Sequence, residues 1–255
     1  MNVLSLFSGI GGLELGLERA GMTVVGQVEI DDYCRCVLAK HWPEVPRHDD
    51  VRTAVDWWQS EPRPAVDLVC GGFPCQPVSV AGLKRAQEDE RWLWPAMAHV
   101  IAEIRPRWVV AENVPGLRKL GLADVLGDLD RLGYRARPGL ISACAVGAPH
   151  ARQRLFTLAH AESHRCGQGR AWRSDLHAAP RPRKQEPVLA HPDRVRAEPE
   201  RRDWWAAEPD VARMAHGIPD RVDRTRALGN AVVPQVAEHV GRLILATDAE
   251  RGAAA

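Results

Sequence analysis

A cysteine in a loop of glycines and prolines is the first residue of this sequence that could carry out covalent chemistry. Cys75 stands in Gly71-Gly72-Phe73-Pro74-Cys75-Gln76-Pro77, directly after an apolar run at 66–70. A thiolate is a good nucleophile, although most buried cysteines act only as small hydrophobic residues. Prolines remove backbone donors, so this segment is poor material for a core element. We therefore interpret Cys75 as a candidate nucleophile.

A carboxyl group and two guanidinium groups stand at the borders of other apolar runs. Glu112 follows the run at 108–111, and Arg152 and Arg154 precede the run at 155–156. Desolvation at the end of a buried strand raises the pKa of a carboxyl group, which could then donate a hydrogen bond to a ring nitrogen. The two arginines alternate, so a strand would present both on one face. The alternatives are a capping or surface glutamate and a solvated strand end.

A glycine turn precedes a helical pattern near the N-terminus. The turn is Phe7-Ser8-Gly9-Ile10-Gly11-Gly12, and Glu29 follows Gly11 by 18 residues. Glycines allow a tight turn and close approach of a ligand, and an acid at the end of the next strand can receive ribose hydroxyls. The pattern is not a strict G-x-G-x-x-G, so it also fits a plain strand–helix connection.

Short apolar runs alternate with helical patterns around these residues. Strands are expected at 2–7, 23–29, 65–70, 108–111 and 154–159, and helices at 13–20, 32–41, 92–104 and 235–245. This alternation predicts an α/β fold with a doubly wound, mostly parallel sheet. The carboxyl ends of parallel strands share one crevice, so the candidate residues are expected to meet there.

Composition bounds the class of protein. The chain has 255 residues, of which 45% are hydrophobic, and a formal net charge of +1. That is enough for one sizeable core, and any basic surface must be local. We expect a cytoplasmic protein with reduced thiols, because no apolar run is long enough to span a membrane and no signal peptide is evident. The six cysteines have no zinc-binding spacing, so no metal is expected.

The composition changes near residue 160. From there to about 202 hydrophobic periodicity nearly vanishes, and Arg, His, Pro and Glu dominate. This segment is either a disordered linker or a small loop-rich binding domain. We predict a catalytic and cofactor-binding domain at 1–159, a target-recognition region at 160–203, a returning segment at 204–245 and a flexible tail at 246–255.

Five segments occur in the order and spacing of the DNA cytosine-5 methyltransferase family, which the chain resembles over about 1–159 and 204–245. They are Phe7–Gly11 for F-x-G-x-G, 68–81 for the Pro-Cys loop, Glu112-Asn113-Val114 for E-N-V, Pro149–Arg154 for Q-x-R-x-R, and Gly229–Pro234 for G-N-x-V. His150 stands where the family usually has glutamine. The resemblance implies a Rossmann-like S-adenosylmethionine-dependent methyltransferase fold with helices on both faces of the sheet, plus a small loop-rich target-recognition domain.

The same resemblance implies a cofactor site for S-adenosyl-L-methionine, with S-adenosyl-L-homocysteine as product. Glu29 would hold the ribose hydroxyls and Asp50 would approach the adenine amino group. The other implied cofactor residues are Phe7, Gly9, Gly11, Ile30, Pro74, Asn230 and Val232. The C-terminal helix would return beside the glycine turn.

The implied reaction is methylation of carbon 5 of cytosine in a specific double-stranded DNA sequence, on a base flipped out of the duplex. Cys75 would add to carbon 6, Glu112 would contact ring N3 and the amino group, and Arg154 would hold the 2-oxo group. Arg152, the fourth predicted catalytic residue, would support the loop or reach nearby backbone.

DNA is the implied partner of several residues after the nucleophile. Gln76 and Ser79 would contact phosphate or the orphan base, and Lys84, Arg85 and Arg91 could supply phosphate charge, with a solvated surface as the equal alternative. We expect a monomer. A cognate restriction endonuclease acting on the same site is the protein partner that a restriction–modification system would add.

Three other functions compete with this interpretation. The first is a tRNA cytosine-5 methyltransferase of the same fold, but that branch tends to carry Cys-Phe-Thr after E-N-V, which is absent here. The second is a non-catalytic DNA-binding homologue, which the presence of Cys75, Glu112, Arg154 and the glycine turn disfavours. The third is a dinucleotide oxidoreductase, which lacks a strict glycine fingerprint and would leave these residues unused.

Overall fold

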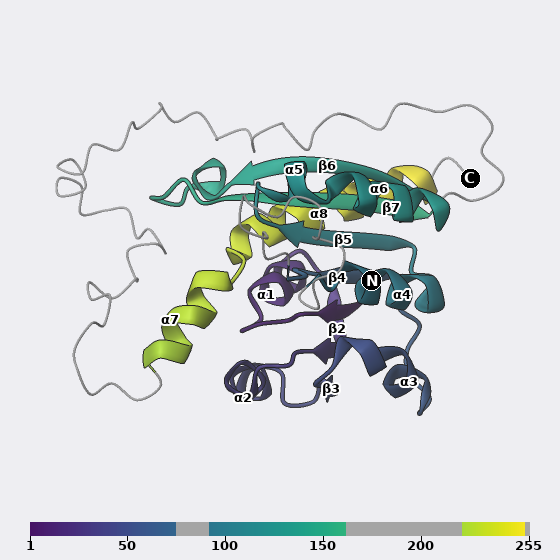
Figure 1. Ribbon diagram of the computed structural model, residues 1–255, viewed down its shortest axis with the longest axis horizontal. Coiled ribbons are helices and arrows are strands. Elements are labelled where there is room, and N and C mark those ends of the chain that lie inside the picture. Colours follow the sequence, from purple (N-terminus) through teal and green to yellow (C-terminus); the bar gives the residue numbers. More distant parts are fainter. Residues whose placement is uncertain (75–91, 162–220, 253–255) are drawn as a thin grey trace.

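The computed structural model describes residues 1–74, 92–161 and 221–252. Within these residues the chain forms a mixed sheet of seven strands with helices on both faces (Figure 1). The strands are β1 (Asn2–Leu6), β2 (Thr23–Val28), β3 (Arg47–His48), β4 (Leu68–Gly71), β5 (Trp108–Asn113), β6 (Tyr134–Ser142) and β7 (Gln153–Ala161). The helices are α1 (Gly12–Arg19), α2 (Asp32–His41), α3 (Ala54–Gln59), α4 (Trp94–Ile104), α5 (Leu117–Leu120), α6 (Leu122–Arg131), α7 (Arg221–Asn230) and α8 (Pro234–Gly252), with 3-10 turns η1 (Val51–Thr53) and η2 (Ala143–Val146).

The order of the strands creates a crevice at one edge of the sheet. Neighbouring strands follow the order β3-β2-β1-β4-β5-β7-β6. The pairs from β3 to β5 are parallel, while β7 runs antiparallel to β5 and β6. The chain builds outward from β1 to β3 and then returns to add β4 and β5 on the other side. A crevice opens where the order reverses, at the carboxyl ends of β1 and β4. The predicted mostly parallel, doubly wound sheet is confirmed.

Two apolar cores hold the helices against the sheet. On one face, α3, α4 and α6 contribute Trp58, Met97 and Val125. On the opposite face, α1 and α8 contribute Leu17 and Val240. Successive side chains of a strand point to opposite faces, so each strand supplies both cores. The result is a three-layer α/β/α arrangement with helices on both faces, as the sequence predicts.

Glycines allow α1 and α8 to approach each other closely. A Cβ atom on Gly16 would lie 2.2 Å from the carbonyl oxygen of Pro234 and 2.4 Å from the Cβ of Ala237. A Cβ atom on Gly241 would lie 2.7 Å from that of Ala20. Larger residues at either glycine would therefore push the helices apart. The expected return of the C-terminal helix beside the glycine turn is observed, and α8 begins next to the first turn of α1.

The predicted tail at 246–255 requires a correction. Helix α8 continues past the expected end at 245 and reaches Gly252. Its last turns are anchored on the sheet, because Trp108 Nε1 donates to Asp248 Oδ1 at 3.1 Å and Arg107 Nη1 lies 3.2 Å from the same oxygen. Polar residues there form contacts with strand β5 rather than a free tail.

Two predicted segments extend beyond the described residues. The target-recognition region at 160–203 is described only at 160–161, which close β7, and the returning segment is described from 221 onward. In the parts that are described, no helix combines the length and the hydropathy needed to cross a membrane.

Candidate active site

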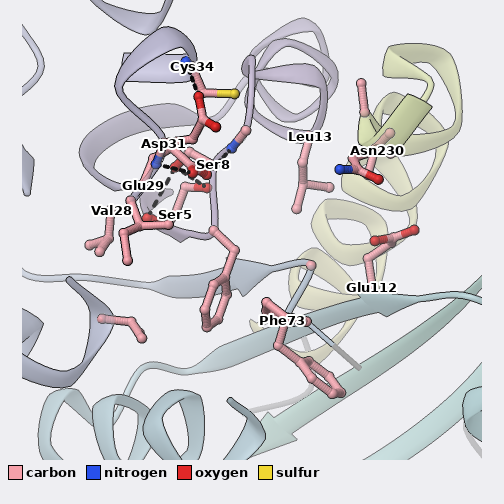
Figure 2. Close-up of a pocket in the computed structure, with 18 of the residues that line it drawn as sticks. Ser5, Ser8, Leu13, Val28, Glu29, Asp31, Cys34, Phe73, Glu112 and Asn230 are labelled. Atoms are coloured by element: carbon pink, nitrogen blue, oxygen red, sulfur yellow. Dashed lines mark hydrogen bonds between the residues drawn. The ribbon is translucent and has the colours of Figure 1, made fainter. Parts of the chain in front are cut away.

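A cavity of about 890 Å³ lies at the carboxyl ends of β1, β2, β4 and β5, beneath one face of α7. Its wall includes ten of the predicted site residues: Phe7, Gly9, Glu29, Ile30, Asp50, Pro74, Glu112, Arg154, Asn230 and Val232. Figure 2 shows Glu29, Asp31 and Ser8 gathered on one side of the cavity, with Glu112 and Asn230 on the other. Strand topology has thus brought together residues that are far apart in the sequence.

The glycine turn has an unusual backbone that its neighbours hold in place. Phe7 and Gly9 both have a φ of 55°, and Gly11 has a φ of 87°. A left-handed conformation is strained for a residue with a side chain, so Phe7 needs support from its surroundings. The Ser8 amide donates to the carbonyl oxygen of Val28 at 3.1 Å, and the Gly11 amide donates to that of Ser8 at 3.0 Å. These bonds fix the turn against β2.

Glu29 connects the turn to the start of α2. Its Oε2 accepts from the Gly9 amide at 2.7 Å, and its Oε1 accepts from the Asp31 amide at 2.8 Å. Asp31 in turn caps α2 by accepting from the Cys34 amide at 3.0 Å. Two backbone donors therefore fix the plane of the Glu29 carboxylate at the cavity wall, while each oxygen keeps lone pairs for hydroxyl donors.

Asp50 is a second acid on the same side. Arg52 Nη2 lies 2.7 Å from Asp50 Oδ2, and the Arg52 amide donates to Asp50 Oδ1 at 2.9 Å. These hydrogen bonds lower the pKa of Asp50 below its usual range, so it is ionised at neutral pH. Ile30 also lies on the wall and is 68% exposed, which leaves an apolar surface available to a planar ligand.

Gly11, a predicted cofactor contact, is not on the wall of this cavity, although Gly9 and Gly12 are. A Cβ atom on Gly11 would lie 2.3 Å from the ring of Trp42, at the end of α2. Gly11 and Trp42 instead line a second cavity on the other side of the turn. The left-handed φ of Gly11 and its contact with Trp42 explain why glycine is needed there: it shapes the turn from behind.

Acidic groups outnumber basic groups on the cavity wall. The acids are Glu29, Asp31, Asp49, Asp50, Glu112 and Asp223, and the bases are Arg52, Arg154 and Arg226. All three of these bases are paired with acids of the same wall, Arg52 with Asp50, Arg154 with Glu112 and Arg226 with Asp31. Carboxylates fixed by backbone donors suit a ribose diol, and the excess of negative charge suits a cation. The site therefore fits a nucleoside ligand that carries positive charge.

Glu112 lies at the opposite side of the cavity, at the end of β5. Only 6% of its surface is exposed. Burial raises its pKa to about 7, although Arg154 and Arg152 act in the opposite direction. Arg154 Nε lies 2.8 Å from Glu112 Oε1, but its N–H is not directed at that oxygen, which has no hydrogen-bond partner in the described part of the chain. The pair is thus a close, buried ionic contact on the cavity wall.

The antiparallel register explains why Glu112 and Arg154 meet. Glu112 pairs with Phe156 across β5 and β7. Arg154 is two residues from Phe156, so it is a diagonal neighbour of Glu112 on the same face. The predicted alternation of Arg152 and Arg154 therefore places both guanidinium groups on the face that carries Glu112.

Two residues that the sequence does not single out connect Glu112 to the loop that leads to Cys75. A Cβ atom on Gly72 would lie 2.7 Å from Glu112 Oε2, so only glycine leaves room for the carboxyl group. Asn113 Nδ2 donates to the carbonyl oxygen of Phe73 at 2.9 Å, and Asn113 Oδ1 accepts from the Val114 amide at 2.8 Å. Asn113, the middle residue of the E-N-V segment, thus holds the start of the loop in place.

Phe73 fixes the same loop from the other face of the sheet. Its ring packs against those of Trp92 and Trp94, with centroids 5.5 Å and 5.3 Å away. Pro74 follows on the cavity wall and is the last described residue of this segment. Cys75, Gln76, Ser79, Lys84, Arg85 and Arg91 lie outside the described residues.

Arg152 lies behind the cavity wall. Its Nη2 donates to the carbonyl oxygens of Gly229 at 2.5 Å and Ala231 at 2.9 Å. These carbonyls flank Asn230, and Asn230 and Val232 are on the wall. Arg152 thus reaches the backbone of the G-N-A-V segment, which is one of the two roles that the resemblance implies for it.

Helix α7 supplies a further part of the wall that the sequence analysis does not identify. Asp223, Arg226 and Ala227 face the cavity together with Asn230, at helical spacing. Arg226 Nη1 lies 4.0 Å from Asp31 Oδ2, across the mouth of the cavity. In the sequence, this part of the wall is indicated only by polar residues at helical spacing directly before the G-N-A-V segment.

Comparisons with known proteins agree with this arrangement. The chain is 36% identical over 168 residues to the Type II methyltransferase M2.BsuMI of Bacillus subtilis (strain 168), covering 62% of this chain and 42% of that protein. It is 37% identical over 163 residues to the Type II methyltransferase M.Eco47II of Escherichia coli, covering 62% of this chain and 39% of that protein. The chain thus spans less than half the length of these curated relatives.

A solved structure and a family model complete the comparison. A crystal structure described as a DNA modification methyltransferase encoded within an E. coli prophage matches with a TM-score of 0.54 and 29% identity, covering 63% of this chain and 47% of that one. The fold is therefore the Rossmann-like methyltransferase fold. The sequence model described as C-5 cytosine-specific DNA methylase matches residues 1–194. The chain accordingly belongs to the C-5 cytosine-specific DNA methylase family.

Proposed function

We propose that this chain transfers a methyl group from S-adenosylmethionine to carbon 5 of cytosine in double-stranded DNA. The observation that carries the proposal is the position of Glu112, which is buried, ionically paired with Arg154 and close to Gly72 on the loop that leads to Cys75. A carboxyl group with a pKa of about 7 can exchange a proton at neutral pH. Glu112 lies on the wall of the same cavity as Glu29, the acid expected to accept hydrogen bonds from ribose hydroxyls.

Several residues would hold S-adenosylmethionine, which supplies an electrophilic methyl group on its sulfonium when bound. Glu29 would accept hydrogen bonds from the ribose hydroxyls, and Asp50 would approach the adenine amino group. Phe7, Ile30 and Val232 would provide apolar contacts, with Gly9, Pro74 and Asn230 completing the wall. The acidic wall would attract the net positive charge of this ligand.

Glu112 and Arg154 would hold the target cytosine. Protonated Glu112 would donate to ring N3 and accept from the exocyclic amino group, while Arg154 would donate to the 2-oxo group. The closeness of the two side chains supports this role, because Arg154 Nε lies 2.8 Å from Glu112 Oε1 and both residues are on the cavity wall.

Cys75 would make and break the covalent bond. Its thiolate would add to carbon 6, and Glu112 would give a proton to N3 as electron density moves there. Carbon 5 would then take the methyl group, leaving S-adenosylhomocysteine. Loss of the proton from carbon 5, with water as a plausible acceptor, would restore the double bond and expel the Cys75 thiolate, while Glu112 recovers its proton from N3.

The target base must leave the duplex to reach these groups, at a cost of a few kcal/mol of unstacking. Gln76, Ser79, Lys84 and Arg85 would contact the DNA around it, and residues 160–203 would read the target sequence. The enzyme would act as a monomer in the cytoplasm. In a restriction–modification system its partner would be a cognate endonuclease that cuts the same DNA site.

The direct test is a covalent trap. DNA containing 5-fluorocytosine should form an adduct stable in denaturing gels, because fluorine cannot leave carbon 5 as a proton does. Cys75→Ala should abolish both the adduct and methyl transfer while leaving S-adenosylmethionine binding nearly unchanged. Residual turnover above about a thousandth of wild type would contradict the role of Cys75.

Substrate choice needs a separate measurement. Methyl transfer from labelled S-adenosylmethionine to duplex DNA and to tRNA should be compared in parallel, with Glu112→Gln as the inactive control. Label on DNA supports the proposal, and label on tRNA alone would replace it with the tRNA enzyme. Bisulfite sequencing of DNA from cells that express the chain would then give the modified base and its sequence context.

A further inference from the structure

Glu14 is a buried acid that the proposed chemistry does not use. It lies in the first turn of α1 with 0% of its surface exposed. Ser5 Oγ, on β1, donates to Glu14 Oε1 at 2.7 Å. Glu14 Oε2 is buried as well, and among the described residues it has no hydrogen-bond partner. A carboxyl group in such a place is costly, so a reason for its presence must be sought in what it touches.

A short chain of hydroxyl groups links Glu14 to the cavity wall. Ser8 Oγ donates to Ser5 Oγ at 3.1 Å, and both serines line the cavity (Figure 2). Ser8 is also the centre of the glycine turn, between Phe7 and Gly9. The three side chains thus connect α1, β1 and the turn through hydrogen bonds.

The turn is the part of the fold that needs such support. Phe7 holds a left-handed φ of 55° although it is not glycine. A strained conformation persists only where the surrounding structure over-determines it, and strain of this kind is concentrated at ligand sites. The Ser8 hydroxyl ties the turn to Ser5 on β1, and the Gly9 amide ties it to Glu29 after β2.

We propose that Glu14 is a positioning residue that acts through Ser5 and Ser8 on the glycine turn, and that its ionisation strengthens binding of the cationic methyl donor. This inference rests on the proposed function for the identity of the donor. When Glu14 is ionised, it accepts the Ser5 proton, so the lone pairs of Ser8 are available toward the cavity. When Glu14 is protonated, it can donate to Ser5, and the direction of the hydroxyl chain can reverse so that Ser8 presents a proton.

The surroundings of Glu14 set the pH at which this change occurs. Burial raises its pKa to about 7, while hydrogen bonds from the Ser5 side chain, from its own backbone amide and from the Ser8 side chain act in the opposite direction. Glu29 adds a smaller repulsion from β2, and the Cys70 thiol, whose own pKa is raised by burial, faces Glu14 from β4. No cation contributes to the pKa of Glu14 in the described part of the molecule.

The neighbouring helix does not supply a counter-charge either. Helix α8 packs on α1 through apolar side chains such as Val236 and Ala237. Its charged residue Glu238 is paired with Arg242, and the pKa of His239 is lowered by burial and by the same arginine. Ionised Glu14 thus has no counter-charge among the described residues. The sulfonium of a bound S-adenosylmethionine would supply one.

The test is the pH dependence of ligand binding, measured by calorimetry between pH 5.5 and 8.5. The wild-type affinity for S-adenosylmethionine should rise roughly three- to tenfold as the pH passes through 7, the size expected for two charges interacting through the protein interior. S-adenosylhomocysteine, which lacks the sulfonium charge, should show a weaker rise. Glu14→Gln keeps a hydrogen-bond acceptor for Ser5 but cannot ionise, so its affinity should rise clearly less than that of wild type, and the remaining rise belongs to Glu112, whose pKa is also about 7.

Two further variants separate a specific role from a structural one. Glu18→Gln removes the same charge one turn further along α1 and should keep the wild-type pH profile. Ser8→Ala interrupts the hydroxyl chain at the wall and should lower the affinity and flatten its pH dependence, which gives a second test if Glu14→Gln does not fold. If Glu14→Gln shows the wild-type pH dependence of affinity, the inference about Glu14 is wrong, while the proposed function still stands. If only Ser8→Ala folds, a wild-type pH dependence in that variant has the same meaning. Failure of the wild-type protein to bind S-adenosylmethionine at any pH would overturn the proposed function as well.

Discussion

Glu112 and Gly72 occupy adjoining space, with Glu112 Oε2 only 2.7 Å from the position that a Cβ atom on Gly72 would take. Gly72 follows the last residue of β4, and Glu112 is the second-last residue of β5, the next strand of the sheet. The absence of one side chain therefore decides where the carboxyl group of another can lie. This contact links the loop that carries Cys75 to the acid proposed to protonate the base.

Replacing Gly72 by alanine should displace the Glu112 carboxyl group without unfolding the protein, because the contacted atom is the end of a side chain. We expect a decrease in kcat of roughly 10- to 100-fold, since a displacement of about 1 Å in a catalytic group has effects of this size. S-adenosylmethionine affinity should change little. Single-turnover methylation assays would measure the effect.

Gly127→Ala is the matched control for this change. A Cβ atom on Gly127, in α6, would meet nothing within 4 Å, so activity should be unchanged. Alanine should even stabilise this helix by up to about 1 kcal/mol. Equal activity of Gly72→Ala and Gly127→Ala would show that Glu112 is not held as described.

Asn113→Ala should loosen the start of the catalytic loop. The change removes the donor to the Phe73 carbonyl and the acceptor for the Val114 amide, both at the buried end of β5. Leaving buried backbone groups unpaired should lower the free energy of unfolding by about 1–3 kcal/mol. Methyl transfer should fall more than cofactor binding, because the loop leads to Cys75. Urea denaturation and binding measurements would separate these effects, with Val114→Ala as a partly exposed control; unchanged stability would contradict the hydrogen-bond assignment.

The fold core could be predicted because its strands and helices carry strong local patterns. The helix expected at 32–41 coincides with α2, and the apolar strands around β1, β4 and β5 were placed within a few residues. Their order along the chain also implies a shared crevice, so the sequence is enough to assign Glu29 and Glu112 to one cavity. Local periodicity and topology were sufficient there.

Other elements lack such patterns. Strand β6 contains Arg135, Arg137 and Pro138, and among the described strands it pairs only with β7, at the edge of the sheet, where proline and charge are tolerated. Helix α7 turns its polar face to the cavity and carries no apolar stripe. The supporting roles of Gly72, Asn113 and Arg152 depend on contacts between distant segments, and spacing along one sequence does not encode such contacts.

Arg152→Ala distinguishes a supporting residue from a catalytic one. The guanidinium bridges the carbonyl oxygens of Gly229 and Ala231, so its loss should loosen the segment that carries Asn230 and Val232. Because charged hydrogen bonds contribute about 1.5–3 kcal/mol each, we expect the Kd for S-adenosylmethionine to rise roughly tenfold or more. Arg131→Ala, on the exposed face of α6, is the control. An unchanged Kd together with a large fall in kcat would return Arg152 to a direct role in catalysis.

The two buried acids also predict how stability depends on pH. Glu14 and Glu112 have a pKa of about 7 in the folded protein, against 4.5 for the exposed group. Between about pH 4.5 and 7 the folded state therefore binds more protons than the unfolded chain at these sites, and their effect is to lower the free energy of unfolding as the pH rises. His160 acts in the opposite direction, because burial lowers its pKa to about 4.

The contribution of Glu14 can be isolated by comparing Glu14→Gln with wild type in urea denaturation at several pH values. Glutamine has no charge to bury, so the variant should become more stable relative to wild type as the pH rises from about 5 to 8. A pKa shift from 4.5 to about 7 corresponds to about 3 kcal/mol, which is an upper bound on the change in the difference in unfolding free energy between the two proteins. His160 and Glu112 titrate equally in both proteins, so their effects cancel in the difference. Parallel stability curves would mean that Glu14 does not ionise in this range, which would also remove the basis for its proposed influence on the glycine turn.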